Sequence, residues 1–217
     1  LFPTVKINYP KRERKEMRVL SRNEQEQFVS FLLDETDQCK FGVLLMLLSG
    51  VRIGELCALK WENVDLKERT MRVSSTLQRL RNTEADNEKR TRIVVSTPKS
   101  ETSMRTIPLT DHVIRLCERF ADKNTSAFIL TGTEDYMEPR VLQYRIEKYT
   151  KECGLDGVHA HTLRHTFATR AVEVGFEIKS LSEILGHSNT TITLERYVHS
   201  SMELKRSNMD KLTAVGL

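Results

Sequence analysis

The feature that most limits how this chain can fold is a change in hydrophobic period, from helical at both ends to alternating in the middle. Segments 70–77, 90–98 and 102–109 are rich in β-branched residues that roughly alternate with polar ones, a pattern typical of strands. We expect them to form one sheet, with the charged stretch 78–89 as a hairpin loop. The chain is therefore predicted to be mainly α, with a small three-stranded antiparallel β-sheet.

Helical signals lie on both sides of this insert. Ser21 and Glu24 have the spacing of a capping box, which predicts a helix beginning there. Gly50 follows the apolar run "FGVLLMLL" and is expected to end a buried helix. Further helices are predicted at 55–60, 111–122, 138–153, 162–174, 178–185 and 190–199.

Composition excludes some classes of protein and only weakly favours others. The longest apolar run is far shorter than the roughly 20 residues of a membrane-spanning helix. The net charge of +4 is a weak indication of a polyanionic partner. No CxxC pair occurs, so neither a zinc knuckle nor a disulfide framework is indicated, and we expect a reduced, cytoplasmic setting. The scattered cysteines are Cys39, Cys57, Cys117 and Cys153.

Five of the six histidines lie between His159 and His199, which raises three possibilities: a metal site, a phosphate site or a helical core. His161 and His165 are four residues apart, but no carboxylate lies between them and no third ligand is evident, which argues against zinc. His161 and Arg164 fall in a first helical turn, where free backbone N–H groups and the helix dipole favour anions. Because a guanidinium matches a phosphate in shape, the phosphate site is favoured.

Other candidate residues lie at predicted element ends, where side chains can converge on one external ligand. They are Arg52 with Glu55 one turn away, Lys99 at a hairpin tip, His187 in a turn, and Tyr197. Arginines would stabilise charge on a phosphodiester, a tyrosine would serve as covalent nucleophile, and histidines or a lysine would move protons. Taken alone, each is compatible with an ordinary role, such as a turn lysine or a solvated ion pair. The joint pattern favours phosphate chemistry without a metal.

Four motifs in order carry a resemblance to a known family: "SGVRIGELCALKWENVDL", "TPKSETSMRTIPL", "HTLRHTFATR" and "LGHSNTTITLERYVH". From about Ser21 to the region of Lys211, the chain resembles the catalytic domain of tyrosine recombinases. Within them it is most similar to integrases of bacteriophages and conjugative transposons. The resemblance implies the tyrosine recombinase catalytic-domain fold, of the DNA breaking-rejoining type.

The resemblance also implies a role for each candidate residue. Arg52 and Arg164 would clamp the scissile phosphate, His187 would hydrogen-bond it, and Glu55 would support the arrangement from behind. Tyr197 would attack the phosphate, giving a 3′-phosphotyrosyl DNA and a free 5′-hydroxyl. The proton-transfer and supporting groups implied are Lys99, which protonates the departing oxygen, His161, which assists the tyrosine, and His165, in a supporting role.

The implied activity is site-specific recombination, by which a mobile element is integrated or excised without a cofactor, ATP or a metal ion. The implied partner is double-stranded DNA, bound by a homotetramer on paired sites, although the isolated domain could be monomeric. We interpret 1–20 as a linker from an absent N-terminal DNA-binding region, 21–200 as the catalytic domain, and 201–217 as a tail that could dock on a neighbouring subunit. A type IB topoisomerase-like enzyme, an inactive DNA-binding module and, less favoured, a metal-dependent nuclease stay open as alternatives.

Overall fold

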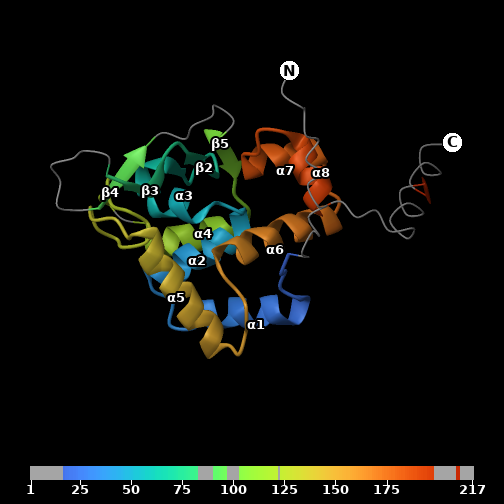
Figure 1. Ribbon diagram of the computed structural model, residues 1–217, viewed down its shortest axis with the longest axis horizontal. Coiled ribbons are helices and arrows are strands. Elements are labelled where there is room, and N and C mark those ends of the chain that lie inside the picture. The colour runs from blue at the N-terminus through green and yellow to red at the C-terminus, as the bar shows by residue number, and fades with distance from the viewer. Residues whose placement is uncertain (1–16, 83–89, 97–102, 122, 198–208, 211–217) are drawn as a thin grey trace, which may run out of the picture.

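The computed structural model describes residues 17–82, 90–96, 103–121, 123–197 and 209–210 of the chain. Helix α6 crosses the middle of the molecule, with α1 below it, the strands and α5 toward one end, and α7 and α8 at the other (Figure 1). The α-helices are α1 (Arg22–Leu33), α2 (Gln38–Ser49), α3 (Ile53–Cys57), α4 (Asp111–Phe120), α5 (Pro139–Glu152), α6 (Ala160–Glu173), α7 (Ile178–Leu185) and α8 (Thr190–Tyr197). A short 3-10 helix, Trp61–Asn63, follows α3.

Helix α2 is the centre of the hydrophobic core. Nine of its twelve residues are buried, because α1, α3, α4 and α6 all pack against it. A helix covered on every side needs no polar face, which explains the apolar run in its sequence. Gly42 is required by this packing, because a Cβ at that position would lie 2.3 Å from Cδ2 of the buried Leu130.

Most predicted helix ends are confirmed. Ser21 and Glu24 form the capping box of α1. Gly50 ends α2 at φ 68°, and Gly186 ends α7 at φ 63°, in the left-handed conformation that glycine adopts at little cost. Helix α6 begins two residues earlier than predicted, because His159 is its N-cap and its side chain accepts a hydrogen bond from the backbone N–H of Thr162.

Helix α3 begins at Ile53, two residues before the predicted 55–60 segment, and it ends at Cys57. The helix does not continue to residue 60, because Lys60 pairs with Phe128 in an isolated antiparallel bridge.

The expectation of one sheet made from three strands is wrong in its pairing. The strands are β1 (Val64–Asp65), β2 (Thr70–Val73), β3 (Thr76–Arg81), β4 (Thr91–Ser96) and β5 (Arg105–Pro108). They form two antiparallel sheets, one ordered β1-β2-β5 and the other pairing β3 with β4. The predicted strand 70–77 therefore divides at Ser74 and Ser75, and its halves belong to different sheets.

Burial explains the division. In β2, Met71 and Val73 are buried and face the core, whereas β3 is exposed from Gln78 onward. The second sheet is thus a ribbon that extends the hairpin into the segment expected to be loop. Alternation of residue types indicated the strands, but it carries no information about which strands pair. The mainly helical fold with small antiparallel sheets is confirmed.

Two properties of the described residues bear on the classes that composition argued against, membrane-spanning proteins and disulfide-bonded proteins. None of their helices is long and apolar enough to cross a membrane. All four cysteines are buried and have free thiols.

Replacing Gly42 with valine is expected to lower the free energy of unfolding by about 1–3 kcal/mol, because the added methyls overpack the contact with Leu130. Urea denaturation followed by circular dichroism measures the change. Lys148→Val, at an exposed position in the middle of α5, serves as the control for valine in a helix and should cost below about 1 kcal/mol. Equal losses for the two variants would contradict the packing argument.

Candidate active site

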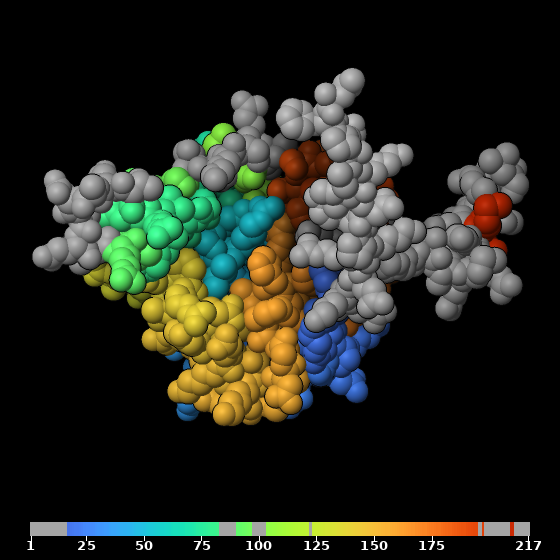
Figure 2. Space-filling view, in the orientation of Figure 1, coloured from blue at the N-terminus to red at the C-terminus, as the bar shows by residue number. Residues whose placement is uncertain are grey.

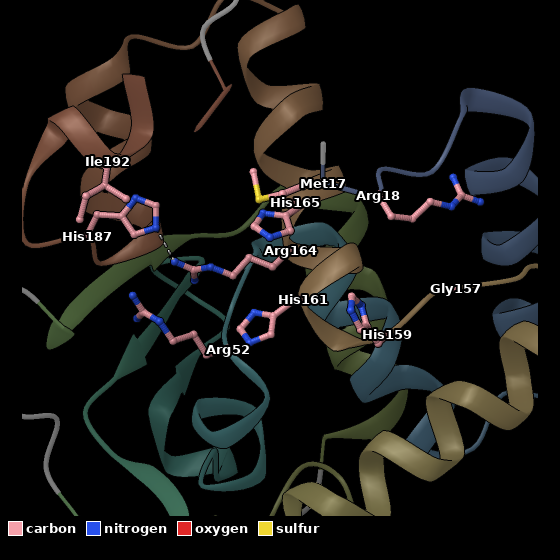
Figure 3. Close-up of a pocket in the computed structure, with 10 residues that line it drawn as sticks. All are labelled: Met17, Arg18, Arg52, Gly157, His159, His161, Arg164, His165, His187 and Ile192. Atoms are coloured by element: carbon pink, nitrogen blue, oxygen red, sulfur yellow. Dashed lines mark hydrogen bonds between the residues drawn. The ribbon is translucent and has the colours of Figure 1, made fainter. Parts of the chain in front are cut away.

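The candidate site is an open cleft of about 750 Å³ bordered by the start of α6, the turn between α2 and α3, and the segment joining α7 to α8 (Figure 3). In the space-filling view, the cyan surface around α3 lies beside the orange surface of α6, and the red-brown surface of α7 and α8 adjoins them (Figure 2). No carboxylate occurs among the described residues that line the cleft. The basic and imidazole side chains of the lining are Arg18, Arg52, Arg164, His159, His161, His165 and His187.

Arg164 is fixed by the ends of two helices. Its side chain enters the protein from α6 and is 4% exposed. Its two terminal nitrogens donate to the carbonyl of Gly50, at 2.6 Å, and to the carbonyl of Leu185, at 2.7 Å. These carbonyls lie at the C-terminal ends of α2 and α7, where they lack partners within their helices and the helix dipole is negative. The guanidinium is therefore oriented before any ligand arrives.

The charge on Arg164 is costly to keep at this position. Burial, followed by the nearby positive charge of Arg52, lowers the pKa of Arg164 to about 9. A lowered pKa of a base means that the folded protein disfavours its protonated form. A bound anion would relieve that cost, so the cleft is electrostatically suited to a phosphate.

Arg52 is held by the same helix end from the other side. It is the N-cap residue of α3, and its side chain is about one-third exposed. One terminal nitrogen donates to Glu55 Oε1 at 2.7 Å, and the other donates to the carbonyl of Gly186 at 2.8 Å. The two arginines thus share the C-terminal end of α7, and both reach the cleft (Figure 3).

Glu55 is the buried counter-ion of Arg52 and of a further arginine, Arg105. It is 4% exposed, and its carboxylate accepts hydrogen bonds from Arg52 and from both terminal nitrogens of Arg105, at 2.8 and 3.0 Å. Burial alone would raise the pKa of Glu55, but the hydrogen bonds and charge of Arg105, together with Arg52, outweigh burial and lower that pKa below its usual value. Glu55 is therefore ionised at neutral pH.

Arg105 is a residue of the site that the sequence did not reveal. Its side chain is 6% exposed, and it also donates to the carbonyl of Ile184 in α7. Arg105 begins β5, and its contact with Glu55 spans fifty residues of sequence. The sequence feature that could have identified Arg105 is a positively charged residue at the start of a predicted strand, which a buried carboxylate elsewhere in the chain would have to pair with. No spacing rule connects two such distant positions.

His187 connects Arg164 to α8. Its Nε2 lies 3.1 Å from a terminal nitrogen of Arg164, and its Nδ1 lies 2.8 Å from Oγ1 of the buried Thr193. A guanidinium can only donate hydrogen bonds, so Nε2 accepts and the ring proton resides on Nδ1, which donates to Thr193. The ring is thereby held in one tautomer facing the cleft.

Tyr197 ends α8 and is 7% exposed. Its ring packs in a small apolar cluster with Ala168 and Ala171 of α6 and Leu181 and Leu185 of α7. Its hydroxyl oxygen lies 2.7 Å from Nδ1 of His165.

The two histidines of the "HTLRHTFATR" motif occupy different positions. His165 is half-buried and contacts the tyrosine, whereas His161 is exposed and lies near Arg52 (Figure 3). Their ring centroids are 6.3 Å apart. The structure thus brings His165, expected only to support the site, to the tyrosine hydroxyl that His161 was expected to assist.

Some predictions concern residues outside the described part of the chain. Lys99 is one of these, so its role as the acid stays a prediction. The linker at 1–20 is described only from residue 17, and the tail at 201–217 only at 209–210, so their assignments also stay predictions. Within the described residues, no cluster of three or more His, Cys, Asp or Glu side chains has a geometry that would hold a metal ion.

Residues 18–203 match the phage integrase family. The chain belongs to this family. Among curated relatives, this family member is 28% identical to the transposase from transposon Tn916 of Enterococcus faecalis, over 89% of this chain and 52% of the relative. It is 26% identical to a tyrosine recombinase XerC-like protein of Caldanaerobacter subterraneus, over 78% of this chain and 47% of the relative. The chain thus spans about half the length of these relatives.

Solved structures agree with this assignment. The Tn1549 transposon integrase, in complex with a circular intermediate DNA, superposes with a TM-score of 0.73 and 26% identity, covering 94% of this integrase-family chain and 68% of the other. XerA recombinase superposes with a TM-score of 0.64 at 23% identity, which supports the fold. The predicted tyrosine recombinase catalytic-domain fold is confirmed.

Replacing Arg105 with alanine is expected to lower the free energy of unfolding by about 3–5 kcal/mol, because it leaves the buried Glu55 carboxylate with a single cation. Urea denaturation at neutral pH measures the loss. Arg69→Ala, which breaks the exposed ion pair with Asp111, is the matched control and should cost about 0–1 kcal/mol. If Arg105→Ala costs no more than Arg69→Ala, the buried pair does not hold the site together.

Proposed function

We propose that this domain cleaves and rejoins double-stranded DNA at specific sites through Tyr197, and that it serves to integrate or excise a mobile element. One observation carries the proposal: two arginines, each fixed by helix-end carbonyls, reach a single cleft beside a tyrosine whose hydroxyl contacts an imidazole. This arrangement suits a phosphodiester and a covalent step. The relatives named above are a transposon's transposase, a recombinase-like protein and an integrase bound to DNA, which supports the same reaction class.

Phosphate binding is assigned to Arg52, Arg164 and His187. The guanidiniums would contact the non-bridging oxygens and stabilise the charge that grows on them in the transition state. His187 now accepts a hydrogen bond from Arg164, so it would donate to a phosphate oxygen only after its Nε2 gains a proton. The anion itself favours that protonation, because it adds negative charge beside the ring.

The chemistry proceeds in two balanced steps. The Tyr197 oxygen gives its proton to a histidine of the cleft and attacks phosphorus as the bond to the 5′ oxygen breaks, and the 5′ oxygen takes a proton, a role assigned to Lys99. In the second step, a 5′-hydroxyl loses its proton and attacks the phosphotyrosine, and the tyrosine leaves and regains its own proton. The energy of the phosphodiester bond is retained in the covalent intermediate, so the sequence of steps consumes no ATP.

Assembly and setting follow from the reaction as further proposals. Exchange of strands between two duplexes needs several cleavage sites, for which we propose a homotetramer on paired DNA sites. Because the substrate is genomic or plasmid DNA, the reaction would take place in the cytoplasm.

Tyr197→Phe is expected to abolish covalent attachment to DNA, because it removes the only attacking oxygen of the proposed step. A nicked half-site that loses its 5′ fragment traps the adduct, which a denaturing gel resolves and peptide mapping assigns. The control Tyr144→Phe, at an exposed position on α5, should give the wild-type amount. An unchanged adduct with Tyr197→Phe would overturn the nucleophile assignment.

The same reactions separate the alternative functions. Relaxation of a supercoiled plasmid without any recombination site would favour a topoisomerase. Tight duplex binding without an adduct would favour a binding module. Loss of cleavage on addition of EDTA would indicate a metal-dependent nuclease.

Arg164→Ala is expected to lower the single-turnover cleavage rate by about 10²–10³, as for removal of a preorganised donor. Rapid-quench measurement at saturating DNA isolates the chemical step from binding. Arg115→Ala, an exposed arginine of α4 that does not line the cleft, controls for loss of general positive charge and should leave the rate unchanged. Equal rates for both variants would exclude Arg164 from transition-state stabilisation.

A further inference from the structure

We propose that His165 is the proton acceptor for Tyr197 during DNA cleavage and returns that proton to the tyrosine during rejoining. This assignment rests on the proposed function and adds a catalytic residue to it. The observation that carries it is the 2.7 Å separation between His165 Nδ1 and the Tyr197 hydroxyl oxygen.

The contact is built into the packing of three helices. His165 follows Arg164 in α6, so its side chain projects from the helix about 100° further round, toward α8. The rings of His165 and Tyr197 are 5.7 Å apart between centroids. Ala168 and Ala171, further along the same helix, leave room for the tyrosine ring, and Leu185 of α7 packs in the same cluster. The tyrosine is therefore held with its hydroxyl at the imidazole.

Arg164 favours the loss of the proton from Tyr197. A neutral imidazole with its proton on Nε2 presents Nδ1 as an acceptor for the tyrosine O–H. As the proton leaves, negative charge develops on the tyrosine oxygen, and Arg164 interacts electrostatically with Tyr197 and favours that charge.

His161 occupies a different part of the cleft from His165. Its ring is exposed and lies toward Arg52, one helical turn before His165 (Figure 3). The two ring centroids are 6.3 Å apart. The two imidazoles therefore occupy different parts of the cleft, with His165 at the attacking oxygen and His161 toward Arg52.

The step balances as follows. The bond between the Tyr197 oxygen and phosphorus forms as the hydroxyl proton moves to His165 Nδ1, which becomes an imidazolium. The bond from phosphorus to the 5′ oxygen breaks, and that oxygen takes a proton from the acid on its own side. During rejoining, the bond to the tyrosine breaks, and His165 Nδ1 gives the proton back.

His165→Asn is the test variant, because its amide oxygen can accept the tyrosine hydrogen bond but cannot take the proton. Single-turnover cleavage of the nicked half-site should fall by about 10²–10⁴, the usual contribution of a general base. The measurement is repeated on DNA whose bridging 5′ oxygen is replaced by sulfur, which departs as a thiolate without needing a proton. The defect of His165→Asn should persist on this substrate.

His161→Asn is the matched control on the same helix. On the sulfur substrate its defect should be smaller than that of His165→Asn, because the tyrosine proton is assigned to His165. Exogenous imidazole should restore part of the cleavage by His165→Ala but not by Tyr197→Phe. Thermal unfolding and duplex affinity of each variant show whether the fold is kept, and His165→Gln replaces any variant that does not fold.

The outcomes separate this inference from the proposed function. A wild-type adduct at Tyr197, with His165→Asn and His165→Gln cleaving within about threefold of wild type, would overturn the base assignment alone. Recovery of His165→Asn on the sulfur substrate would also overturn it, because the lost group would then be the acid. An adduct formed on a residue other than Tyr197 would overturn the proposed function and this inference together.

Discussion

The site depends on the hydrogen bonds that two arginines donate to the C-terminal carbonyls of α2 and α7. Each helix ends at a glycine whose left-handed conformation turns the chain and leaves those carbonyls pointing at the guanidiniums. The same helix ends that close the core therefore aim Arg52 and Arg164 into the cleft. The orientation of these two arginines for a phosphate therefore follows from how the helices terminate.

Sequence patterns predicted what is local in this structure. The capping box at Ser21, the glycine at Gly50 and the apolar α2 all involve residues within a few turns of one another, so spacing alone reveals them. Five residues that line the cleft were candidates from the sequence alone, because an arginine or histidine at an element end is visible there: Arg52, His161, Arg164, His165 and His187. Arg18 and His159, which also line it, were not. The hydrogen-bond partners that fix these side chains were not visible in the sequence.

Long-range pairing accounts for what the sequence could not supply. The split between β2 and β3 depends on which strands face the core, and the alternating pattern is the same for either partner. His161 and His165 are one turn apart and chemically identical, so only the docking of α8 decides which of them meets Tyr197. Arg105 likewise acquires its role from a carboxylate fifty residues away.

The carboxylate of Glu55 lies between two guanidiniums that come from different parts of the chain, α3 and the start of β5. Because the buried carboxylate is shared in this way, the three side chains depend on one another for charge compensation. Glu55 and Arg105 are the two fully buried members, and replacing one of them takes away the main partner of the other's charge, so single replacements there are expected to be lost from a population more often than matched ones. Among relatives of this chain, Glu55 and Arg105 should therefore change together or not at all, whatever DNA sequence each relative recognises.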